Sequence, residues 1–145
     1  MKINKQTTAI ICLSPNDGGM EIDSIKLANK LSTFVETILI SKENSFIEHE
    51  MKNNFSNIKT ETIAFRKNLS ISIFIRTRQI IQKYNIKNII FFGASELKSL
   101  YFAFLGFNIN LIIRHGTTKS TQKKDFFHRL IYSNVNYHIK LYKLL

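Results

Sequence analysis

Short apolar runs and amphipathic segments alternate along the chain. The apolar runs predict six strands, at residues 9–13, 34–40, 58–65, 88–92, 110–113 and 134–139. Apolar residues three or four positions apart predict helices from residue 20, within 41–54, over 68–85, after residue 95 and over 122–133. Strands and helices that alternate at this spacing indicate βαβ units and right-handed crossovers. We therefore expect an α/β fold: a single Rossmann-like domain, doubly wound, with a mostly parallel sheet of about six strands flanked by helices.

The first apolar run passes into a turn-rich loop at residues 14–19, and a helical period follows. In an α/β sheet such a loop lies at the carboxyl end of a strand, where these folds bind ligands. Gly18 and Gly19 would let an anion approach the backbone N–H groups at the helix start. Glu21 and Asp23, expected in the first helical turn, would suit the helix dipole but repel an anion.

Two later loops also follow predicted strands. After residues 88–92, the small residues 93–95 turn into a helix, with Ser95 as the expected N-cap and Gly106 closing the helix. After residues 110–113, a loop at 114–118 carries His115, where loops at strand ends converge on ligands. Position alone also allows a histidine that only bonds neighbouring backbone, and both interpretations stay open.

Composition narrows the class of protein. A chain of 145 residues with 44% hydrophobic residues fits one domain with a buried core and excludes disorder as the default. Cys12 is the single cysteine and lies in an apolar run, so it predicts a small buried side chain and fits a reduced, cytoplasmic setting. No basic-then-apolar leader opens the chain, and its longest apolar stretch is too short to cross a bilayer.

The net charge of +11 is unevenly distributed. Residues 1–61 hold seven Lys/Arg and eight Asp/Glu, a net of −1, whereas residues 62–145 hold fourteen and two, a net of +12. Such segregation points to a polyanionic partner: nucleic acid, anionic lipid or a phosphorylated glycan. Basic residues beside aromatic ones in the predicted helix at 122–133 suit a membrane interface, although the core face of an amphipathic helix is the simpler interpretation of those aromatic residues. A solvated outer face is the simpler interpretation of any single charge on the predicted helix at 68–85.

Several common signatures are missing from the sequence. No GxGxxG follows the first strand, and no GxxxxGK[ST] occurs, so neither a dinucleotide fingerprint nor a P-loop is present. No CxxC or HExxH motif accompanies the four histidines, and the sequence contains no acidic DxD cluster. We therefore expect no metal site.

Four segments resemble, in order, the N-terminal half of GT-B glycosyltransferases, particularly the retaining enzymes of family 4. They are GGME at residues 18–21, IIFFGAS at 89–95, LIIRHG at 111–116 and FFHRLIYSNVNYHI at 126–139. The resemblance implies two Rossmann-like domains, the first for the acceptor and the second for the nucleotide-sugar donor, with catalysis in the cleft between them and no metal cofactor.

The resemblance also assigns residues. Gly18 and Gly19 would match the loop that approaches the donor diphosphate, and Gly116 would complete the substrate-binding set. His115 would match the catalytic histidine that meets the transferred sugar. Glu21 would match the acid of the glycine motif, with a structural role. Residues 1–145 contain no counterpart of the donor-binding domain, so we expect this chain alone to be inactive.

The resulting expectation is the acceptor-binding domain of a bacterial glycosyltransferase facing the cytoplasm. It would transfer sugar from a nucleotide-sugar, with a UDP-sugar as the expected donor, to a growing lipopolysaccharide or surface polysaccharide with retention. The expected partners are a glycan or glycolipid acceptor, the missing donor-binding domain and, through the basic half, an anionic membrane surface on the inner face of the plasma membrane rather than nucleic acid. The alternative is a stand-alone basic Rossmann-like module that binds nucleic acid or a nucleotide.

Overall fold

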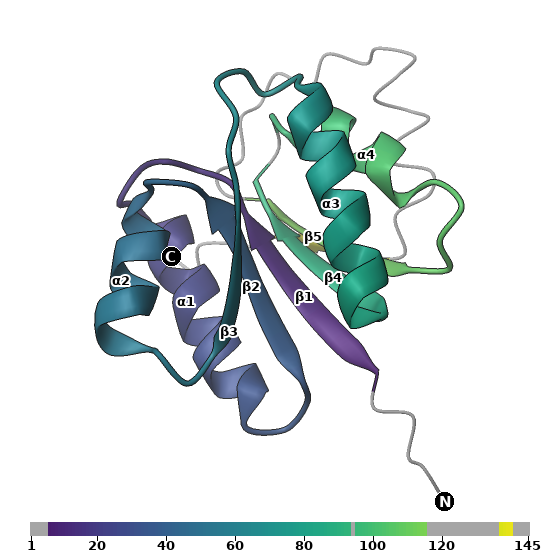
Figure 1. The fold of residues 1–145 in the computed structure, drawn as a ribbon. Helices are drawn as coiled ribbons and strands as arrows, with labels where there is room; N and C mark the ends of the chain where they lie inside the picture. The colour runs from purple at the N-terminus through teal and green to yellow at the C-terminus, as the bar shows by residue number, and fades with distance from the viewer. Residues whose placement is uncertain (1–5, 94, 116–136, 141–145) are drawn as a thin grey trace, which may run out of the picture.

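The computed structural model describes residues 6–93, 95–115 and 137–140 (Figure 1). Gly116 and the helix expected at residues 122–133 lie outside this part of the chain. The strands are β1 (Thr7–Cys12), β2 (Thr37–Lys42), β3 (Lys59–Ile63), β4 (Ile86–Phe92), β5 (Asn110–His115) and β6 (Tyr137–Lys140). The helices are α1 (Gly19–Ser32), α2 (Phe46–Asn54), α3 (Ile71–Tyr84) and α4 (Leu97–Phe104).

The six strands form one sheet in the order β3-β2-β1-β4-β5-β6, and every neighbouring pair is parallel. The chain builds outward from β1 to β3 and then crosses back to place β4 on the other side of β1. Helices α1 and α2 cover one face, and α3 and α4 cover the other (Figure 1). The expected doubly wound, Rossmann-like fold with a parallel sheet is confirmed.

Strand β1 shows why the sheet has two cores. Its residues alternate between the faces: Ala9 and Ile11 pack with α3 and α4, whereas Ile10 and Cys12 pack with α1 and α2. All four side chains are completely buried. A central parallel strand is covered on both faces, which is why this run is apolar without a polar alternation. The edge strand β3 instead carries polar residues and buries only its last side chain, that of Ile63.

The predicted start of the second strand was wrong. Residues 34–36 belong to the turn after α1, because the N–H groups of Phe34 and Val35 both donate to the carbonyl oxygen of Leu31. Phe34 is therefore 72% exposed rather than part of the sheet. Ile22 of α1 is also a large apolar side chain on the surface, with 40% exposed.

Two boundaries near the carboxyl edge also differ from expectation. The N-cap of α4 is Glu96 rather than Ser95, and it makes no side-chain capping hydrogen bond. Strand β5 continues through Arg114 and His115, which were expected in a loop. These residues stay in the strand because they pair with β6, Arg114 with Ile139 and His115 with Lys140.

No helix in the described part of the chain combines the length and apolar composition needed to cross a bilayer.

The edge strand β3 is joined to α3 through the Glu61 carboxylate. It accepts hydrogen bonds from Arg76 Nη2 at 2.9 Å, Lys83 Nζ at 2.8 Å and Tyr84 Oη at 2.6 Å, and its side chain is only 10% exposed. Burial raises the pKa of Glu61, but the bonds from Lys83 and Tyr84 and the nearby positive charges outweigh it. The net effect is a pKa below the ordinary value of 4.5.

Replacing Glu61 with Gln is expected to lower the free energy of unfolding by about 1 kcal/mol at pH 7. Because the pKa of Glu61 is lower in the folded chain than in the unfolded one, its contribution is present above pH 4.5 and is lost as the pH falls below that value. Urea unfolding of both chains at neutral and acid pH measures this, with exposed Glu43→Gln as the control. A difference between Glu61→Gln and the original chain that persists at acid pH would contradict the account.

Candidate functional site

Three neighbouring strands end together at the carboxyl edge of the sheet. Cys12 of β1 pairs with Phe92 of β4, which in turn pairs with Arg114 of β5. The chain leaves β1 toward β2 but leaves β4 toward β5, so the strand order reverses between β1 and β4. Doubly wound folds bind ligands in the crevice at such a point. We call the described residues at this edge, 13–19, 93, 95–96 and 114–115, the rim.

The glycine loop of the rim leads directly into α1. Gly18 is the N-cap residue, with extended backbone angles, and no side chain caps the first N–H groups of the helix. A Cβ added at Gly18 would lie 2.9 Å from Glu21 Oε2, so a larger residue would displace that carboxylate. A Cβ at Gly19 would meet nothing within 4 Å. Packing therefore favours glycine at residue 18, whereas Gly19 leaves open space beside the helix start.

The two acids of α1 have different environments. Glu21 lies in the first turn and is only 3% exposed. Ser24, which is completely buried, donates from Oγ to the carbonyl oxygen of Glu21 at 2.7 Å. Asp23 lies two residues further along α1, beyond the first turn, and its charge is balanced by Arg114. The sequence predicted that both acids would repel an anion. The positive charge of Arg114 reduces this repulsion at Asp23.

Arg114 joins the end of β5 to α1. Its Nη2 donates to Asp23 Oδ2 at 2.6 Å, and its guanidinium carbon lies 5.0 Å from the centre of the Phe92 ring. The Arg114 side chain is 15% exposed. This ion pair between residues 91 positions apart fixes the start of α1 against the end of β5. It thus holds the glycine loop and the last residues of β5 on one rim.

A second buried carboxyl group follows β4. Glu96 is 8% exposed, and Gly93 has a φ of +135°, which strongly favours glycine. A Cβ at Gly93 would lie 3.2 Å from Phe91 Cζ and 3.3 Å from Glu96 Oε2. The turn after β4 therefore requires glycine both for its backbone angle and for room beside Glu96.

Cys12 lies at the end of β1, within reach of the charges of Glu21 and Glu96, and is completely buried. Burial, with smaller contributions from the charges of Glu21 and Glu96, raises the pKa of the Cys12 thiol from 9.0 to about 11. Hydrogen bonds with the Ser14 backbone and the Ser24 side chain offset part of this increase. The thiol is therefore protonated at neutral pH, so Cys12 is a packing residue, not a nucleophile.

In the folded chain, alkylation of Cys12 by iodoacetamide at pH 8 is expected to be at least ~100-fold slower than in urea, because the raised pKa depletes the thiolate and burial excludes the reagent. Mass spectrometry over time measures both rates. Equal rates in the folded and unfolded chains would show that Cys12 is accessible and would remove it from the core.

The expected site residues fall at the rim as far as they are described. Gly18 and Gly19 lie at the start of α1, and the backbone of His115 is the last residue of β5, one position after Arg114. The glycine loop and His115 therefore lie on the same edge of the sheet. Gly116 lies outside the described residues, and the catalytic role of His115 stays a prediction.

The fold matches solved structures along almost the whole chain. MurG from Acinetobacter baumannii superposes with a TM-score of 0.69 at 10% identity, covering 94% of this chain and 42% of MurG. A putative UDP-N-acetylglucosamine 2-epimerase from Listeria monocytogenes gives 0.57 at 10% identity, covering 94% of this chain and 38% of the epimerase. Both have the GT-B fold. The chain has the fold of a GT-B domain.

This likeness concerns the fold, since so few residues are identical. The chain spans about two fifths of the length of each matched GT-B protein. No protein-family model matches the sequence, and no curated protein sequence is significantly similar to it.

Sequence reasoning missed two residues of the rim. Glu96 is one of only two acids in residues 62–145 and follows a small-residue turn, so its rarity there was an available signal. Arg114 was expected in a loop, and no pattern in the neighbouring sequence indicates its ion pair with Asp23 of α1. Within the described residues, no three His, Cys, Asp or Glu side chains are arranged to hold a metal ion.

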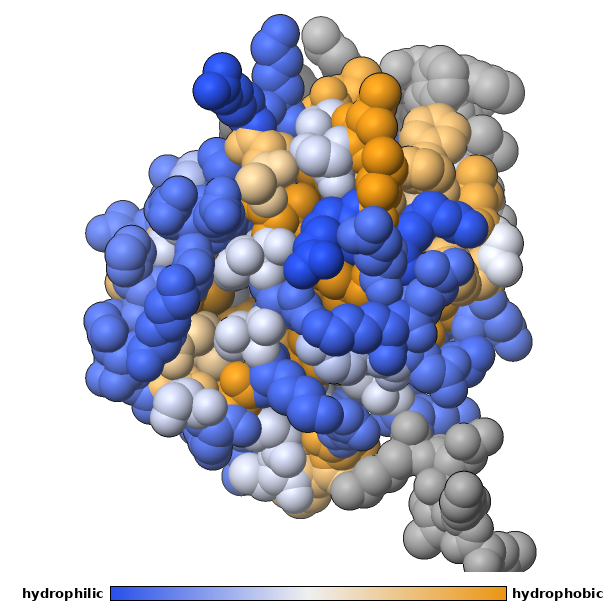
Figure 2. All heavy atoms as spheres, in the orientation of Figure 1, coloured by the Kyte–Doolittle hydropathy of each residue, from blue (hydrophilic) through white to orange (hydrophobic). Residues whose placement is uncertain are grey.

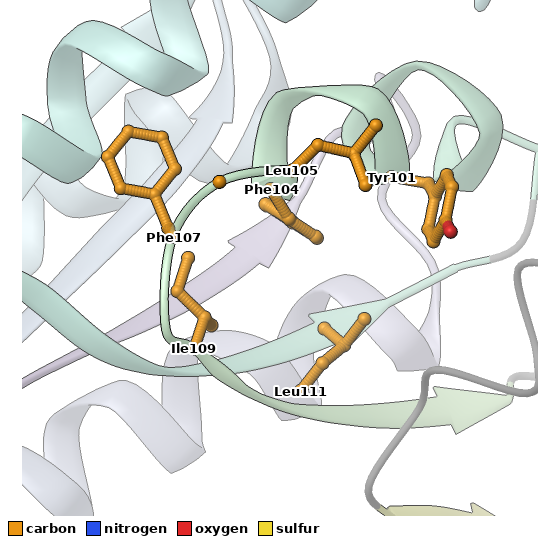
Figure 3. A pocket seen from close by; sticks show the side chains of 7 residues that line it. Tyr101, Phe104, Leu105, Phe107, Ile109 and Leu111 are labelled. Atoms are coloured by element: carbon orange, nitrogen blue, oxygen red, sulfur yellow. The ribbon is translucent and has the colours of Figure 1, made fainter.

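A separate apolar pocket of about 210 Å³ lies beside the start of β5, away from the rim (Figure 3). Its lining comes from α4, the turn after it and β5: Tyr101, Phe104, Leu105, Gly106, Phe107, Ile109 and Leu111. Figure 3 shows these side chains converging from both sides of the turn. Ligands of doubly wound folds bind at the carboxyl ends of strands, so this pocket is not the candidate site.

Proposed function

We propose that this chain is the acceptor-side domain of a glycosyltransferase that uses a nucleotide-sugar. Its rim would form one wall of a cleft, and a second GT-B domain that binds the donor would form the other. Gly18, Gly19 and Gly116 would contact substrate, and His115 would meet the transferred sugar. Without the second domain, the chain would not transfer sugar.

The observation that carries this proposal is the shared edge of the glycine loop and His115 in a GT-B fold. The register from Cys12 through Phe92 to Arg114 places the two segments at one level of the sheet. The Arg114–Asp23 ion pair joins the end of β5 to α1, the helix that the glycine loop begins. One matched GT-B structure is named for a UDP-sugar, which agrees with a UDP-sugar donor.

We extend the proposal to the acceptor and the stereochemistry. The motifs at residues 18–21 and 111–116 resemble those of retaining family 4 enzymes, so we infer retention and no requirement for metal. A growing lipopolysaccharide or surface polysaccharide of a bacterium is the inferred acceptor. Such an acceptor would be met on the cytoplasmic side, where nucleotide-sugars are available.

A different candidate function follows from the uncapped start of α1. A helix N-terminus at the reversal point of a doubly wound sheet is a favourable place for phosphate, so the alternative function is nucleotide binding by the chain alone. Calorimetric titration of the isolated chain with UDP and ATP distinguishes the two functions. The acceptor-side proposal expects binding no tighter than millimolar, and micromolar binding would favour the nucleotide-binding module.

Sugar transfer tests the proposal itself. The chain, joined after Leu145 to the donor-binding domain of a GT-B enzyme, is assayed with radiolabelled UDP-N-acetylglucosamine and a panel of bacterial glycolipid acceptors. We expect transfer by the joined protein and none by either domain alone. Transfer that is equally efficient when residues 1–145 are left out would overturn the proposal.

A further inference from the structure

Two carboxyl groups are buried where β1 and β4 end. Glu21 is 3% exposed and Glu96 is 8% exposed. Glu21 belongs to α1, on one face of the sheet, and Glu96 is the N-cap of α4, on the other face (Figure 1). Burial raises the pKa of the Cys12 thiol, and the charges of Glu21 and Glu96 raise it further, so both carboxylates lie within electrostatic range of the end of β1. We call Glu21 and Glu96 the carboxyl pair.

The carboxyl pair has no partner in the described part of the chain. None of the ion pairs there includes Glu21 or Glu96, and no N–H or O–H group there donates to either carboxylate. A buried charge without a partner is costly. Among the described residues, Thr77 Oγ1 is the one side-chain polar atom that is sealed in the core without a hydrogen bond. The oxygens of the carboxyl pair therefore still reach the surface.

A glycine keeps space open beside each of these carboxylates. A Cβ added at Gly18 would lie 2.9 Å from Glu21 Oε2, and one added at Gly93 would lie 3.3 Å from Glu96 Oε2. The carboxyl pair thus faces the two glycine turns that follow β1 and β4, where the strand order reverses. Doubly wound folds bind their ligands at this point. The carboxyl pair is therefore placed to contact a ligand.

The charge around the carboxyl pair is opposite to that of the whole chain, which carries +11. Residues 13–23, 93, 95–96 and 114–115 hold four acids and a single cation, Arg114, which is paired with Asp23. Figure 2 shows hydrophilic side chains gathered over α3, the helix that carries Arg76, Arg78 and Lys83. Basic surface thus lies on α3, whereas the described surroundings of the carboxyl pair are acidic.

A protonated amino group is the ligand group that best satisfies the carboxyl pair. It supplies positive charge, which a hydroxyl group does not, and its N–H groups donate to carboxylates, which only accept. A phosphate would instead be repelled by acids that have no counter-charge. A metal ion fits less well, because no three His, Cys, Asp or Glu side chains of the described residues are arranged to hold one.

We propose that the carboxyl pair binds a protonated amino group of the ligand, and that this group belongs to an amino sugar of the acceptor. The amino group would lie in front of Gly18 and Gly93. Only the assignment to an acceptor sugar rests on the proposed function. Binding of an amine does not require sugar transfer, so the two proposals fail separately.

The test compares two probes that differ only at the nitrogen: methyl glucosaminide and its N-acetyl derivative. Each is titrated into the isotope-labelled 145-residue chain at a pH where the free amine is protonated, and amide chemical shifts give the dissociation constants. We expect the amine to bind at least ~10-fold more tightly than the acetylated sugar. Because the net charge of +11 repels cations in general, such binding would be local.

Substitutions that remove only the charge identify the groups responsible. Glu21→Gln and Glu96→Gln should each weaken binding of the amine by roughly 10-fold and leave binding of the acetylated sugar unchanged. Glu50→Gln is the matched control, because it removes the same charge from α2, away from the rim, and should have no effect. Neither rim substitution should lower the melting temperature, since each removes a buried charge that has no partner.

The proposal is overturned by equal affinity for the two probes, by unchanged amine binding in both rim variants, or by an equal loss in the Glu50→Gln control. A lower melting temperature in both rim variants would also overturn it, because the carboxylates would then serve the fold. Sugar transfer by the joined protein with equal affinity for the two probes would contradict only the amine site. Amine-selective binding without any transfer would contradict only the proposed function.

Discussion

Replacing His115 with alanine is expected to reduce sugar transfer by the two-domain protein by roughly 100-fold or more. In the proposed role, the imidazole contacts the transferred sugar where charge changes during the reaction, and removing one such group costs about this factor. The loss should appear in kcat, because the substrate contacts proposed for the glycine loop remain. Initial rates with radiolabelled UDP-N-acetylglucosamine measure it in the joined protein described above.

His49 provides the control for that experiment. It lies exposed on α2, on the face of the sheet opposite α3 and α4, and His49→Ala should leave turnover unchanged. Circular dichroism of both variants checks that the fold is retained. Turnover by His115→Ala equal to that of the original protein would remove His115 from the mechanism.

Replacing Phe91 with alanine is expected to lower the free energy of unfolding by about 3–5 kcal/mol. Phe91 is completely buried on β4 and packs in the core beneath α3 and α4. Its ring also lies against Gly93, so the cavity left by alanine would loosen the turn that carries Glu96. Such a loss is a large fraction of the stability of an ordinary domain, and urea unfolding measures it.

Phe34→Ala is the matched control, because the same side chain is removed from a site that is 72% exposed. Its effect is expected to stay within ~0.5 kcal/mol. Similar losses for the two substitutions would contradict the assignment of Phe91 to the central core.

The order of strands and helices along the chain was predictable, because each element depends on local periodicity. The apolar run at β1 and the helical period of α3 each give a signal within a few residues, and both elements were found. The first and last residues of the strands and helices were harder to predict, because they depend on particular hydrogen bonds. Residues 34–36 look like the start of a strand, yet the backbone N–H groups of Phe34 and Val35 complete the end of α1.

The rim was predictable in its position but not in its detailed contacts. Parallel strands all end at one edge, so a loop after β1 and a residue at the end of β5 had to lie on the same side. The ion pair between Asp23 and Arg114 joins residues 91 positions apart, so no local pattern in the sequence predicts it. Likewise, the burial of Glu21 depends on how the glycine loop folds against it, which periodicity does not specify.

The most direct test of the central claim is a map of amide chemical shifts in the isotope-labelled chain. The chain is titrated with core oligosaccharides released from bacterial lipopolysaccharide, which stand in for the acceptor. The account predicts that the largest shifts fall at residues 14–20, 93, 95–97 and 114–115, around the carboxyl ends of β1, β4 and β5. Shifts concentrated instead at the opposite edge, at residues 32–36 and 106–109, would contradict it.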